Sequence, residues 1–477
     1  MRFRILFATA ALLASIGSAP AQDAANAGAK APANQVPAAA EAPASQAIAV
    51  PYTHFTLPNG LDVILHEDHS VPMVSVNVWY HVGSGSEKPG RTGFAHLFEH
   101  LMFEGSKHVP EGAFDNWLEA AGGNNNGSTT RDRTNYYIDV PSNALDLALF
   151  LESDRMGYLL DIVTPELVNG QRDVVKNERR QSVENAPYGR ASVRLDELLY
   201  PKGHPYSWPT IGYMEDLTAA SAEDVREFFR KYYAPGNASL VIAGDIDPAE
   251  TRRKIERWFS DVKAGAPVEP NEHPPAILNA VKKERLTDKV QLPRLYLAWL
   301  TPAHFAPGDA ELDLVAAVLA GGKNSRLFKR LVYDMQIAQN VSAFQSSGAL
   351  GSEFYVIVTA RPSADKTPDQ VNEEIRQIVD EEIEKLRQAA PDAREVERAV
   401  NQLEAAFFAR MERVGGFGGK ADQLNAYFTS TGNPDYFNED LARYRAIRPN
   451  DIRAAARAYL PAGRRVELTV VPEGGAQ

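Results

Sequence analysis

Two histidines and one glutamate, His96, Glu99 and His100, lie within the stretch GFAHLFEHLMFEG. If this stretch is helical, the two histidines lie one turn apart on the same side of the helix, and Glu99 shares that side. Apolar residues recur there at the spacing of a buried helix stripe. They are Phe94, Leu97, Phe98, Leu101 and Met102. The sequence therefore predicts a helix with one side in the core and a polar side that carries two imidazoles and a carboxylate.

The HxxEH spacing is that of the inverted zincin motif. A satisfied core residue is the ordinary interpretation of a single histidine, but it explains poorly two histidines and a glutamate opposite the core stripe. A catalytic zinc ion takes three protein ligands and leaves its fourth position for water. A third ligand must therefore come from another segment. A purely structural zinc site is disfavoured, because closed sites take four protein ligands.

The best source of a third ligand is TPELVNGQRDVVKNERRQSVEN. Thr164 fits a helix N-cap and Pro165 the first helical position, so a helix is expected to begin there. Four residues then share one face of that helix. They are Gln171, Val174, Val175 and Glu178. From spacing alone, a solvated residue is the stronger interpretation of Glu178, because two arginines follow it.

Several longer segments resemble the pitrilysin (insulinase-like) zinc peptidase family. They are GSGSEKPGRTGFAHLFEHLMFEGSKH around the motif, Asn124 to Pro141, RKYYAPGNASLVIAGDID and LAGGKNSRLF. The second is similar to the strand that follows the family's active-site helix. The resemblance extends from about residue 51 to residue 473. Length and layout are most similar to the short subfamily that includes the mitochondrial processing peptidase and its bacterial relatives.

The resemblance implies one zinc ion per chain, with His96, His100 and Glu178 as ligands and Glu99 as general base. The chemistry is consistent with these roles. Zinc lowers the pKa of its bound water to about 7, and a neighbouring carboxylate can take a proton from the attacking water and later deliver one to the leaving amine.

Two further positions have roles that only the resemblance implies. Gln171 stands where the family often has a second glutamate, so it can hydrogen-bond a ligand but carries no charge. Asn126 matches a position near the backbone of the bound substrate. The alternative for Asn126 is a turn residue within a Gly/Asn-rich stretch.

The second half of the chain lacks an Arg/Tyr pair that holds substrate in self-sufficient family members. In the stretch SRLFKRLVYDMQIAQNVSAF the two positions are occupied by Val332 and Gln339, while Arg326 and Tyr333 lie nearby but out of register. In the short subfamily, a homologous partner subunit supplies the pair. The resemblance therefore implies a heterodimer in which this chain is the zinc-bearing half. The alternative is a homodimer in which Gln339 or Arg326 substitutes.

The N-terminal segment has the pattern of a secretory signal peptide over residues 1–21. Arg2 and Arg4 precede an apolar run from Ile5 to Ile16, which is too short to span a bilayer, and Ala19-Pro20-Ala21 fits a cleavage site. We expect secretion without a membrane anchor after signal removal, into the periplasm if the source is Gram-negative.

Composition divides the remainder of the chain. Residues 22–48 are rich in Ala and Pro and predict a disordered tether. The Pro-dense residues 263–277 predict a linker between an N-terminal zinc-binding peptidase domain (49–262) and a C-terminal homologous domain without the Arg/Tyr pair (278–477).

A weak internal repeat relates these two halves. Asp224-Val225-Arg226, followed by Tyr232 and a strand ending at Gly244, recurs as Asp451-Ile452-Arg453, followed by Tyr459 and a strand ending near Val471. The segments LDVILHE and VSVNVWY alternate like strands, whereas LDLALFLESDRM and AREVERAVNQLEAAFFARM have helical periodicity. This mixture favours an α+β fold. The resemblance implies two homologous α+β domains, each a mostly antiparallel sheet flanked by helices, facing each other across a chamber.

Composition also excludes several functions. The chain has no cysteine, which rules out disulfides, thiolate zinc sites and a cysteine nucleophile. Its net charge of −12 argues against nucleic acid as a partner. The sequence thus predicts a zinc-dependent endopeptidase that acts on peptides or unfolded polypeptides. The alternative is a non-catalytic peptide-binding or scaffold subunit on the same fold.

Overall fold

The computed structural model describes residues 47–474. The chain divides into two units, Met1–Ala49 and Val50–Gln477, and every element discussed below belongs to the second. The predicted signal peptide (1–21) lies outside the described residues, as does the predicted tether (22–48) except for its last two residues. Within residues 47–474, no helix has both the length and the apolar composition that crossing a membrane requires.

Six strands form the first sheet: β1 (Thr53–Thr56), β2 (Asp62–Glu67), β3 (Met73–Tyr80), β4 (Asn124–Thr129), β5 (Thr134–Pro141) and β6 (Ala238–Gly244). Their order is β1-β2-β6-β3-β5-β4, which places β4 at one edge. Only the β2–β6 pair is parallel. The segments LDVILHE and VSVNVWY are β2 and β3, which confirms both strand predictions. The stretch from Asn124 to Pro141 is a hairpin of two strands rather than the single strand expected from the resemblance.

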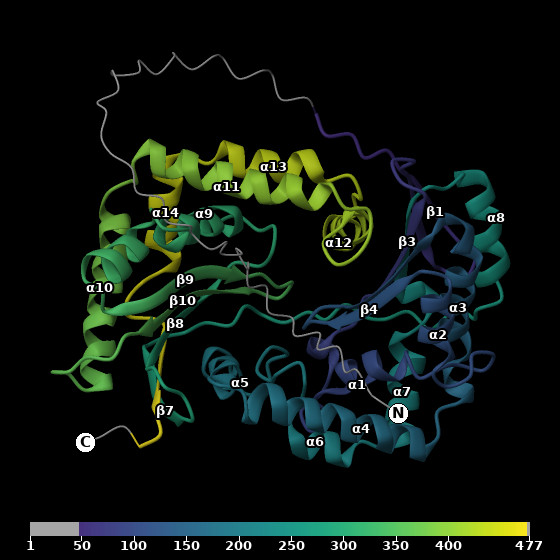
Figure 1. The fold of residues 1–477 in the computed structure, drawn as a ribbon, viewed down its shortest axis with the longest axis horizontal. Helices are drawn as coiled ribbons and strands as arrows, with labels where there is room; N and C mark the ends of the chain where they lie inside the picture. The colour runs from purple at the N-terminus through teal and green to yellow at the C-terminus, as the bar shows by residue number, and fades with distance from the viewer. Residues whose placement is uncertain (1–46, 475–477) are drawn as a thin grey trace, which may run out of the picture. The chain divides into compact units, whose positions relative to one another are not determined.

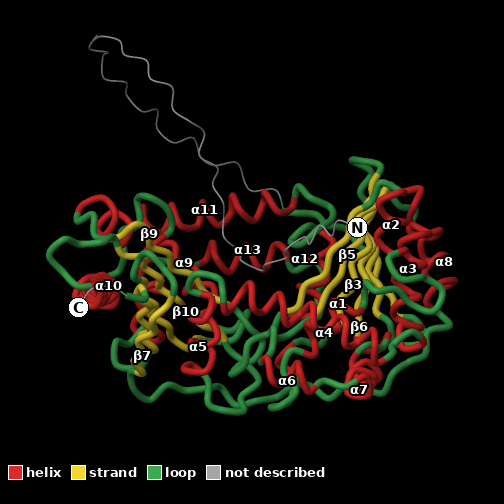
Figure 2. The backbone as a smooth tube through the Cα atoms, turned by 60° about the horizontal axis from the view of Figure 1, so that its bottom comes forward, coloured by secondary structure: helices red, strands yellow, loops and turns green. Residues whose placement is uncertain are grey.

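Five strands form the second sheet: β7 (Lys282–Asp288), β8 (Arg294–Thr301), β9 (Ala338–Ser346), β10 (Ser352–Ala360) and β11 (Val466–Pro472). Their order is β7-β11-β8-β10-β9, and only the β7–β11 pair is parallel. The order and strand directions repeat those of β2-β6-β3-β5-β4. Figure 2 shows the strands gathered in two separate sheets. The shared topology agrees with the repeat seen in the sequence, in which β6 ends at Gly244 and β11 at Pro472.

Helices flank both sheets (Figure 1). The first half contains α1 (Phe94–Leu101), α2 (Ala113–Ala120), α3 (Leu145–Tyr158), α4 (Pro165–Arg179), α5 (Gly189–Leu199), α6 (Met214–Ala219), α7 (Ala222–Tyr232) and α8 (Pro248–Phe259). The second half contains α9 (Asp309–Ala320), α10 (Pro368–Gln388), α11 (Ala393–Met411), α12 (Lys420–Thr431), α13 (Phe437–Ala446) and α14 (Pro449–Tyr459). The helices expected at the HxxEH motif, from Pro165, over LDLALFLESDRM and over residues 393–411 are α1, α4, α3 and α11. These predictions are confirmed.

Each sheet is covered on one face by helices of its own half. In the first half, α3 packs on β3 and β5, while α1 contacts β4 and β5. In the second half, α9 packs on β9, while α10 contacts β8, β10 and β11. The apolar residues of these contacts form a separate buried core in each half. Two sheets flanked by helices confirm the predicted α+β class.

Two helices cross between the halves. Helix α5 packs against β8 and β11 of the second sheet, and α12 packs against β3 and β6 of the first (Figure 1). On α5, Arg194 pairs with Glu284 of β7 (Nε–Oε1 2.7 Å). On α12, Asp422 accepts hydrogen bonds from the Trp79 indole (2.9 Å) and the Asn135 amide (2.8 Å). The exchange fastens each half to the sheet of the other.

The predicted linker lies between the two sheets in the chain. Helix α8 ends at Phe259 and β7 begins at Lys282, with no helix or strand between them. The predicted domains 49–262 and 278–477 are therefore halves of the sequence. In the fold, each sheet is also packed by one helix from the other half. The exact domain boundaries stay a prediction.

The loop after α5 holds a buried histidine. His204 is 6% exposed, its Nδ1 accepts a hydrogen bond from the Tyr206 backbone N–H (3.1 Å), and its ring stacks on Tyr200 (4.6 Å between centroids). Burial lowers the pKa of His204 to about 4, with smaller contributions from the charges of His273 and Arg131. The histidine is therefore neutral in the folded chain at neutral pH.

A lowered histidine pKa makes the folded chain sensitive to acid. Between about pH 6.5 and pH 4 the unfolded chain binds more protons at this site than the folded chain, so the free energy of unfolding falls as the pH falls. We expect the acid-induced fall in the free energy of unfolding to be smaller by roughly 2 kcal/mol in His204→Gln than in the wild type. Urea denaturation of both proteins at pH 7 and pH 4 measures it, with the exposed His54→Gln as control. An equal acid-induced loss in wild type and His204→Gln would contradict the prediction.

Candidate metal centre

Helix α1 begins at a position that requires glycine. Its N-cap Gly93 has φ +84°, and a Cβ there would lie 2.7 Å from the Ile211 carbonyl oxygen. The buried carboxylate of Glu87 accepts hydrogen bonds from the backbone N–H groups of Gly93 (3.0 Å) and Ala95 (2.8 Å). These are donors that a helix N-terminus leaves without an intrahelical partner. Glu87 therefore fixes the start of the helix that carries the motif.

The three residues predicted as zinc ligands lie together. Helices α1 and α4 pack against each other, and donor atoms of His96, His100 and Glu178 all lie within 4.8 Å of one another. The Glu178 carboxylate is 3.7 Å from His96 Nε2 and 3.2 Å from His100 Nε2. Among the residues that the structure describes, this is the only group of three or more His, Cys, Asp or Glu side chains placed to hold a metal. Two imidazoles and a carboxylate are a ligand set that catalytic zinc uses.

The local electrostatics suit a cation. Burial lowers the pKa of His96 and keeps its imidazole neutral, the form that binds metals. Burial also opposes protonation of His100, but the hydrogen bond and charge of Glu178 outweigh it and raise the His100 pKa. Burial likewise opposes ionisation of Glu178, yet the two histidines lower its pKa. Glu178 is thus held as a carboxylate facing both rings.

Glu99 lies on the same helix, next to the cluster, and is 9% exposed. Its Oε2 accepts a hydrogen bond from the Thr129 hydroxyl of β4 (2.7 Å). A Cβ on Gly127, also in β4, would lie 3.1 Å from Glu99 Cγ. The edge strand therefore both orients the carboxylate and approaches it closely. Sequence reasoning did not identify Gly127 or Thr129, because their contacts depend on the hairpin register.

The two further candidates, Gln171 and Asn126, lie on α4 and β4. Gln171 is on α4 and lines a cavity of 640 Å³ together with Glu104 and Glu166. Asn126 lies in edge strand β4, not in a turn, and its Oδ1 accepts a hydrogen bond from the Gly127 backbone N–H (2.8 Å). Their predicted roles stay predictions.

The residues that occupy the two Arg/Tyr positions offer no charged donor. Val332 packs against the core of the second half, and Gln339 is an exposed residue of β9. Arg326 is engaged by Glu395 through two contacts (2.8 and 2.7 Å). The ring of Tyr333 packs on Phe328 (5.4 Å between centroids) and is 48% exposed.

Sequence profiles of one peptidase family match both halves. The insulinase family (peptidase family M16) matches residues 62–199, and the peptidase M16 inactive domain matches residues 219–403. The two matches together span more than half of the chain. The chain belongs to the pitrilysin (insulinase-like) family of peptidases.

Individual relatives agree with this assignment. The chain is 29% identical over 364 residues to the zinc protease PqqE of Helicobacter pylori, covering 75% of this chain and 79% of that protein. It is 24% identical over 425 residues to a probable mitochondrial-processing peptidase subunit beta of Arabidopsis thaliana, covering 85% and 75%. The crystal structure of a protease from H. pylori is similar with a TM-score of 0.80 at 25% identity, covering 89% of this chain and 100% of that chain. A peptidase M16 inactive domain from Pseudomonas fluorescens shares the fold (TM-score 0.78, 18% identity, 89% and 99% covered).

Proposed function

We propose that this chain is a zinc-dependent endopeptidase that hydrolyses peptides or unfolded polypeptides, and that a homologous partner subunit completes its site. The observation that carries the proposal is the convergence of His96, His100 and Glu178 within 4.8 Å, with Glu99 beside them on α1. Relatives of this chain named zinc protease support the choice of metal and reaction class.

In this proposal each residue has a separate task. His96, His100 and Glu178 would hold zinc, which when bound supplies a Lewis acid for attack on a peptide carbonyl. Glu99 takes a proton from the attacking water and delivers a proton to the leaving amine nitrogen. The Thr129 hydroxyl orients Glu99 through the 2.7 Å hydrogen bond.

The position of β4 favours an extended substrate. Among the described strands, β4 pairs only with β5, which leaves its other backbone edge for pairing with a substrate. An extended peptide could add there as a further strand through main-chain hydrogen bonds. It would then pass the carboxylate of Glu99, which contacts Thr129 of the same strand. Folded proteins do not present such a segment, which favours peptides and unfolded chains.

The Gly127→Ala substitution tests the close approach of β4 to the motif. Its methyl group would lie 3.1 Å from atoms of Glu99, Phe103 and Tyr136, so these groups must shift. We expect peptide hydrolysis to fall about tenfold or more, because small misplacements of catalytic groups are costly. The free energy of unfolding should fall by about 1–3 kcal/mol. Steady-state kinetics and urea denaturation measure the two effects.

Gly170→Ala is the matched control for this test. Gly170 is a helical glycine of α4 whose added methyl group would meet no atom within 4 Å, so it should keep full activity. Full activity in Gly127→Ala would show that the edge strand does not restrain the site.

The occupants of the Arg/Tyr positions support the partner proposal. Val332 has no donor, Gln339 is uncharged, and Arg326 is already paired with Glu395. A homologous chain that carries the pair would supply what these positions lack. The proposed assembly is a heterodimer, and the homodimer is the alternative.

A peptide-cleavage experiment tests function and partner together. The zinc-loaded full chain is assayed on a quenched fluorescent peptide library, alone and mixed with a homologous chain that carries the Arg/Tyr pair. Cleavage only in the mixture supports the heterodimer, and equal cleavage by the chain alone supports self-sufficiency. A mixture made with Glu99→Gln controls for activity of the partner.

The non-catalytic alternative makes a different prediction in the same assay. A scaffold or peptide-binding subunit would contain zinc near one ion per chain and cleave no peptide with the partner present. The residues Val332 and Gln339 at the Arg/Tyr positions favour this non-catalytic alternative. The convergence of Glu99 with three metal-binding side chains is not required of a scaffold, and this favours the enzyme.

The location of the protein is a separate proposal. We infer export through the signal peptide of residues 1–21, into the periplasm of a Gram-negative source. The pattern that supports it is the pair Arg2 and Arg4, the apolar run and the cleavage site after Ala21. Fractionation followed by N-terminal sequencing tests it, and a cytoplasmic protein that retains Met1 would contradict it.

A further inference from the structure

A buried ion pair lies on α3, near the C-terminal end of α1, the helix that carries the motif. Arg155 is 1% exposed and Glu152 is 0% exposed. The Arg155 guanidinium donates to both carboxylate oxygens of Glu152, from Nε (2.8 Å) and from Nη2 (2.5 Å). The pair is part of the LDLALFLESDRM segment. The proposed chemistry does not use it.

Arg155 faces the end of α1 and the rings beside it. Its guanidinium carbon lies 4.3 Å from the ring centroid of Tyr136, 4.8 Å from that of Phe114 and 5.4 Å from that of Phe103. These distances are within the range of cation–π attraction. Nη1 also approaches the backbone carbonyl of Met102, two residues after His100 (3.5 Å).

Two of these rings border Gly127 of β4, as Glu99 does. At Gly127 of β4, the position of a Cβ is 3.1 Å from Glu99 Cγ, from Phe103 Cε2 and from Tyr136 Cδ1. Phe103 and Tyr136 also contact each other edge to face (5.7 Å between centroids). Because protein interiors are close-packed, a displacement of either ring is expected to shift Gly127 and, through it, Glu99.

The residue before Arg155 braces the segment that follows α1. Asp154 is buried and accepts hydrogen bonds from the Ser106 hydroxyl (2.5 Å) and the His108 backbone N–H (3.1 Å). Two residues of α3, Asp154 and Arg155, thus contact the segment that follows α1, at Met102, Ser106 and His108. Stability alone does not require an ion pair here, because well-packed apolar residues often replace a buried pair without loss.

We propose that Arg155, held in place by Glu152, is a positioning residue of the peptidase site. It fixes the last turn of α1 and the rings of Phe103 and Tyr136, and through them the carboxylate of Glu99. This inference rests on the peptidase function proposed above and adds a residue that acts on the reaction without touching the substrate.

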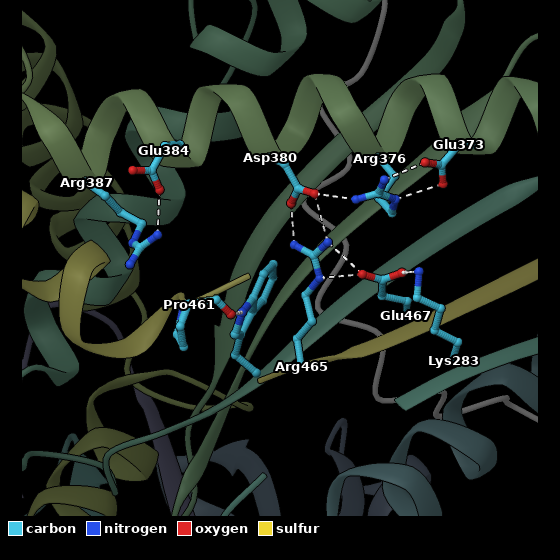
Figure 3. A network of polar contacts seen from close by, with 10 residues as sticks. Lys283, Glu373, Arg376, Asp380, Glu384, Arg387, Pro461, Arg465 and Glu467 are labelled. Atoms are coloured by element: carbon cyan, nitrogen blue, oxygen red, sulfur yellow. Dashed lines mark hydrogen bonds and ion pairs between the residues drawn. The ribbon is translucent and has the colours of Figure 1, made fainter. Parts of the chain in front are cut away.

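The second half of the chain offers a matched control. Arg465 is 1% exposed, bonds to Asp380 of α10 and to Glu467 of β11, and lies 5.5 Å from the Trp299 ring centroid. Figure 3 shows this guanidinium between the two carboxylates. It resembles Arg155 in burial, pairing and ring contact, but it directly precedes β11 of the second sheet, whereas the proposed metal ligands lie on α1 and α4.

The test compares two double variants. Removal of Arg155 alone would leave the buried Glu152 carboxylate unpaired and could unfold the chain. The test variant is therefore Glu152→Leu/Arg155→Met, and the control is Glu467→Leu/Arg465→Met. Both are studied as full chains with zinc and the partner, at a temperature where circular dichroism shows both to be folded. The measurements are kcat, KM, zinc content and hydrogen exchange of the Met102 and Phe103 amides.

The proposal predicts a specific split between these measurements. In the test variant kcat falls about 10- to 100-fold, KM stays within about twofold because ground-state binding is retained, and zinc content is unchanged. The Met102 and Phe103 amides exchange faster. The control variant changes neither kcat nor these amides. Wild-type kcat in the test variant, or the same loss of kcat in both variants, would overturn the positioning role.

The exchange measurement separates this inference from the proposed function. If no form of the chain cleaves any peptide with the partner present, the peptidase proposal fails. Faster exchange at Met102 and Phe103 in the test variant alone would then still support the proposal that Arg155 fixes the end of α1. Unchanged exchange would overturn it.

Discussion

Replacing Glu99 by glutamine is expected to abolish peptide hydrolysis, with kcat falling about 10³-fold or more. The glutamine side chain has the same shape, and its carbonyl oxygen can still accept the Thr129 hydrogen bond that Glu99 accepts at 2.7 Å. It cannot take a proton from water at neutral pH. The expected loss is therefore confined to proton transfer.

Two measurements separate this loss from damage to the site. Zinc content by mass spectrometry and the urea midpoint of Glu99→Gln should equal those of the wild type, because Glu99 is not among the predicted ligands. Glu111→Gln, an exposed carboxylate of the loop after α1, serves as control and should retain activity. An active Glu99→Gln enzyme would disprove the general-base role.

Replacing Glu178 by alanine should affect the metal itself. This substitution removes the only carboxylate of the cluster and the contact at 3.2 Å to His100. Outer-shell substitutions already weaken metal binding about 10- to 100-fold, so removal of a ligand should weaken it by at least about a hundredfold. Activity at limiting zinc should disappear with the metal. Competition against a chromophoric chelator measures the affinity.

The zinc dependence of the free energy of unfolding is an independent test of Glu178 as a ligand. Zinc at about a thousand times the wild-type Kd should raise the free energy of unfolding of the wild type by about 4 kcal/mol, and a hundredfold or greater loss of affinity should reduce this increment to about 1.4 kcal/mol or less in Glu178→Ala. Glu166→Ala, on the first turn of the same helix, should keep the increment. An undiminished zinc-dependent stabilisation in Glu178→Ala would exclude Glu178 as a ligand.

The parts of the site that the sequence predicted are those set by local rules. The spacing of His96 and His100 predicted one face of a helix, and Thr164 with Pro165 predicted the start of α4. The structure confirms that Thr164 caps this helix by accepting a hydrogen bond from the Leu167 N–H. Local periodicity could not show that Glu178 turns toward the histidines. Only the resemblance supplied that partner.

The parts that the sequence did not predict depend on contacts between distant segments. Thr129 reaches Glu99 because β4 and β5 form a hairpin in one register, and a single-strand interpretation of the segment hides that contact. Arg155 has the periodicity of an ordinary buried helix residue. The role proposed for it depends on the rings of Phe103, Phe114 and Tyr136, which come from the loop after α1, from α2 and from β5.

The exchange of α5 and α12 between the halves determines how the two halves can separate. A helix contributed by each half covers the other half's sheet, so neither half separates without uncovering both sheets. We expect a single protease cut in the segment between α8 and β7 to leave two fragments that remain associated and that keep the predicted metal ligands, which all lie before the cut. The two halves form one compact unit, joined by reciprocal packing as well as by the peptide chain.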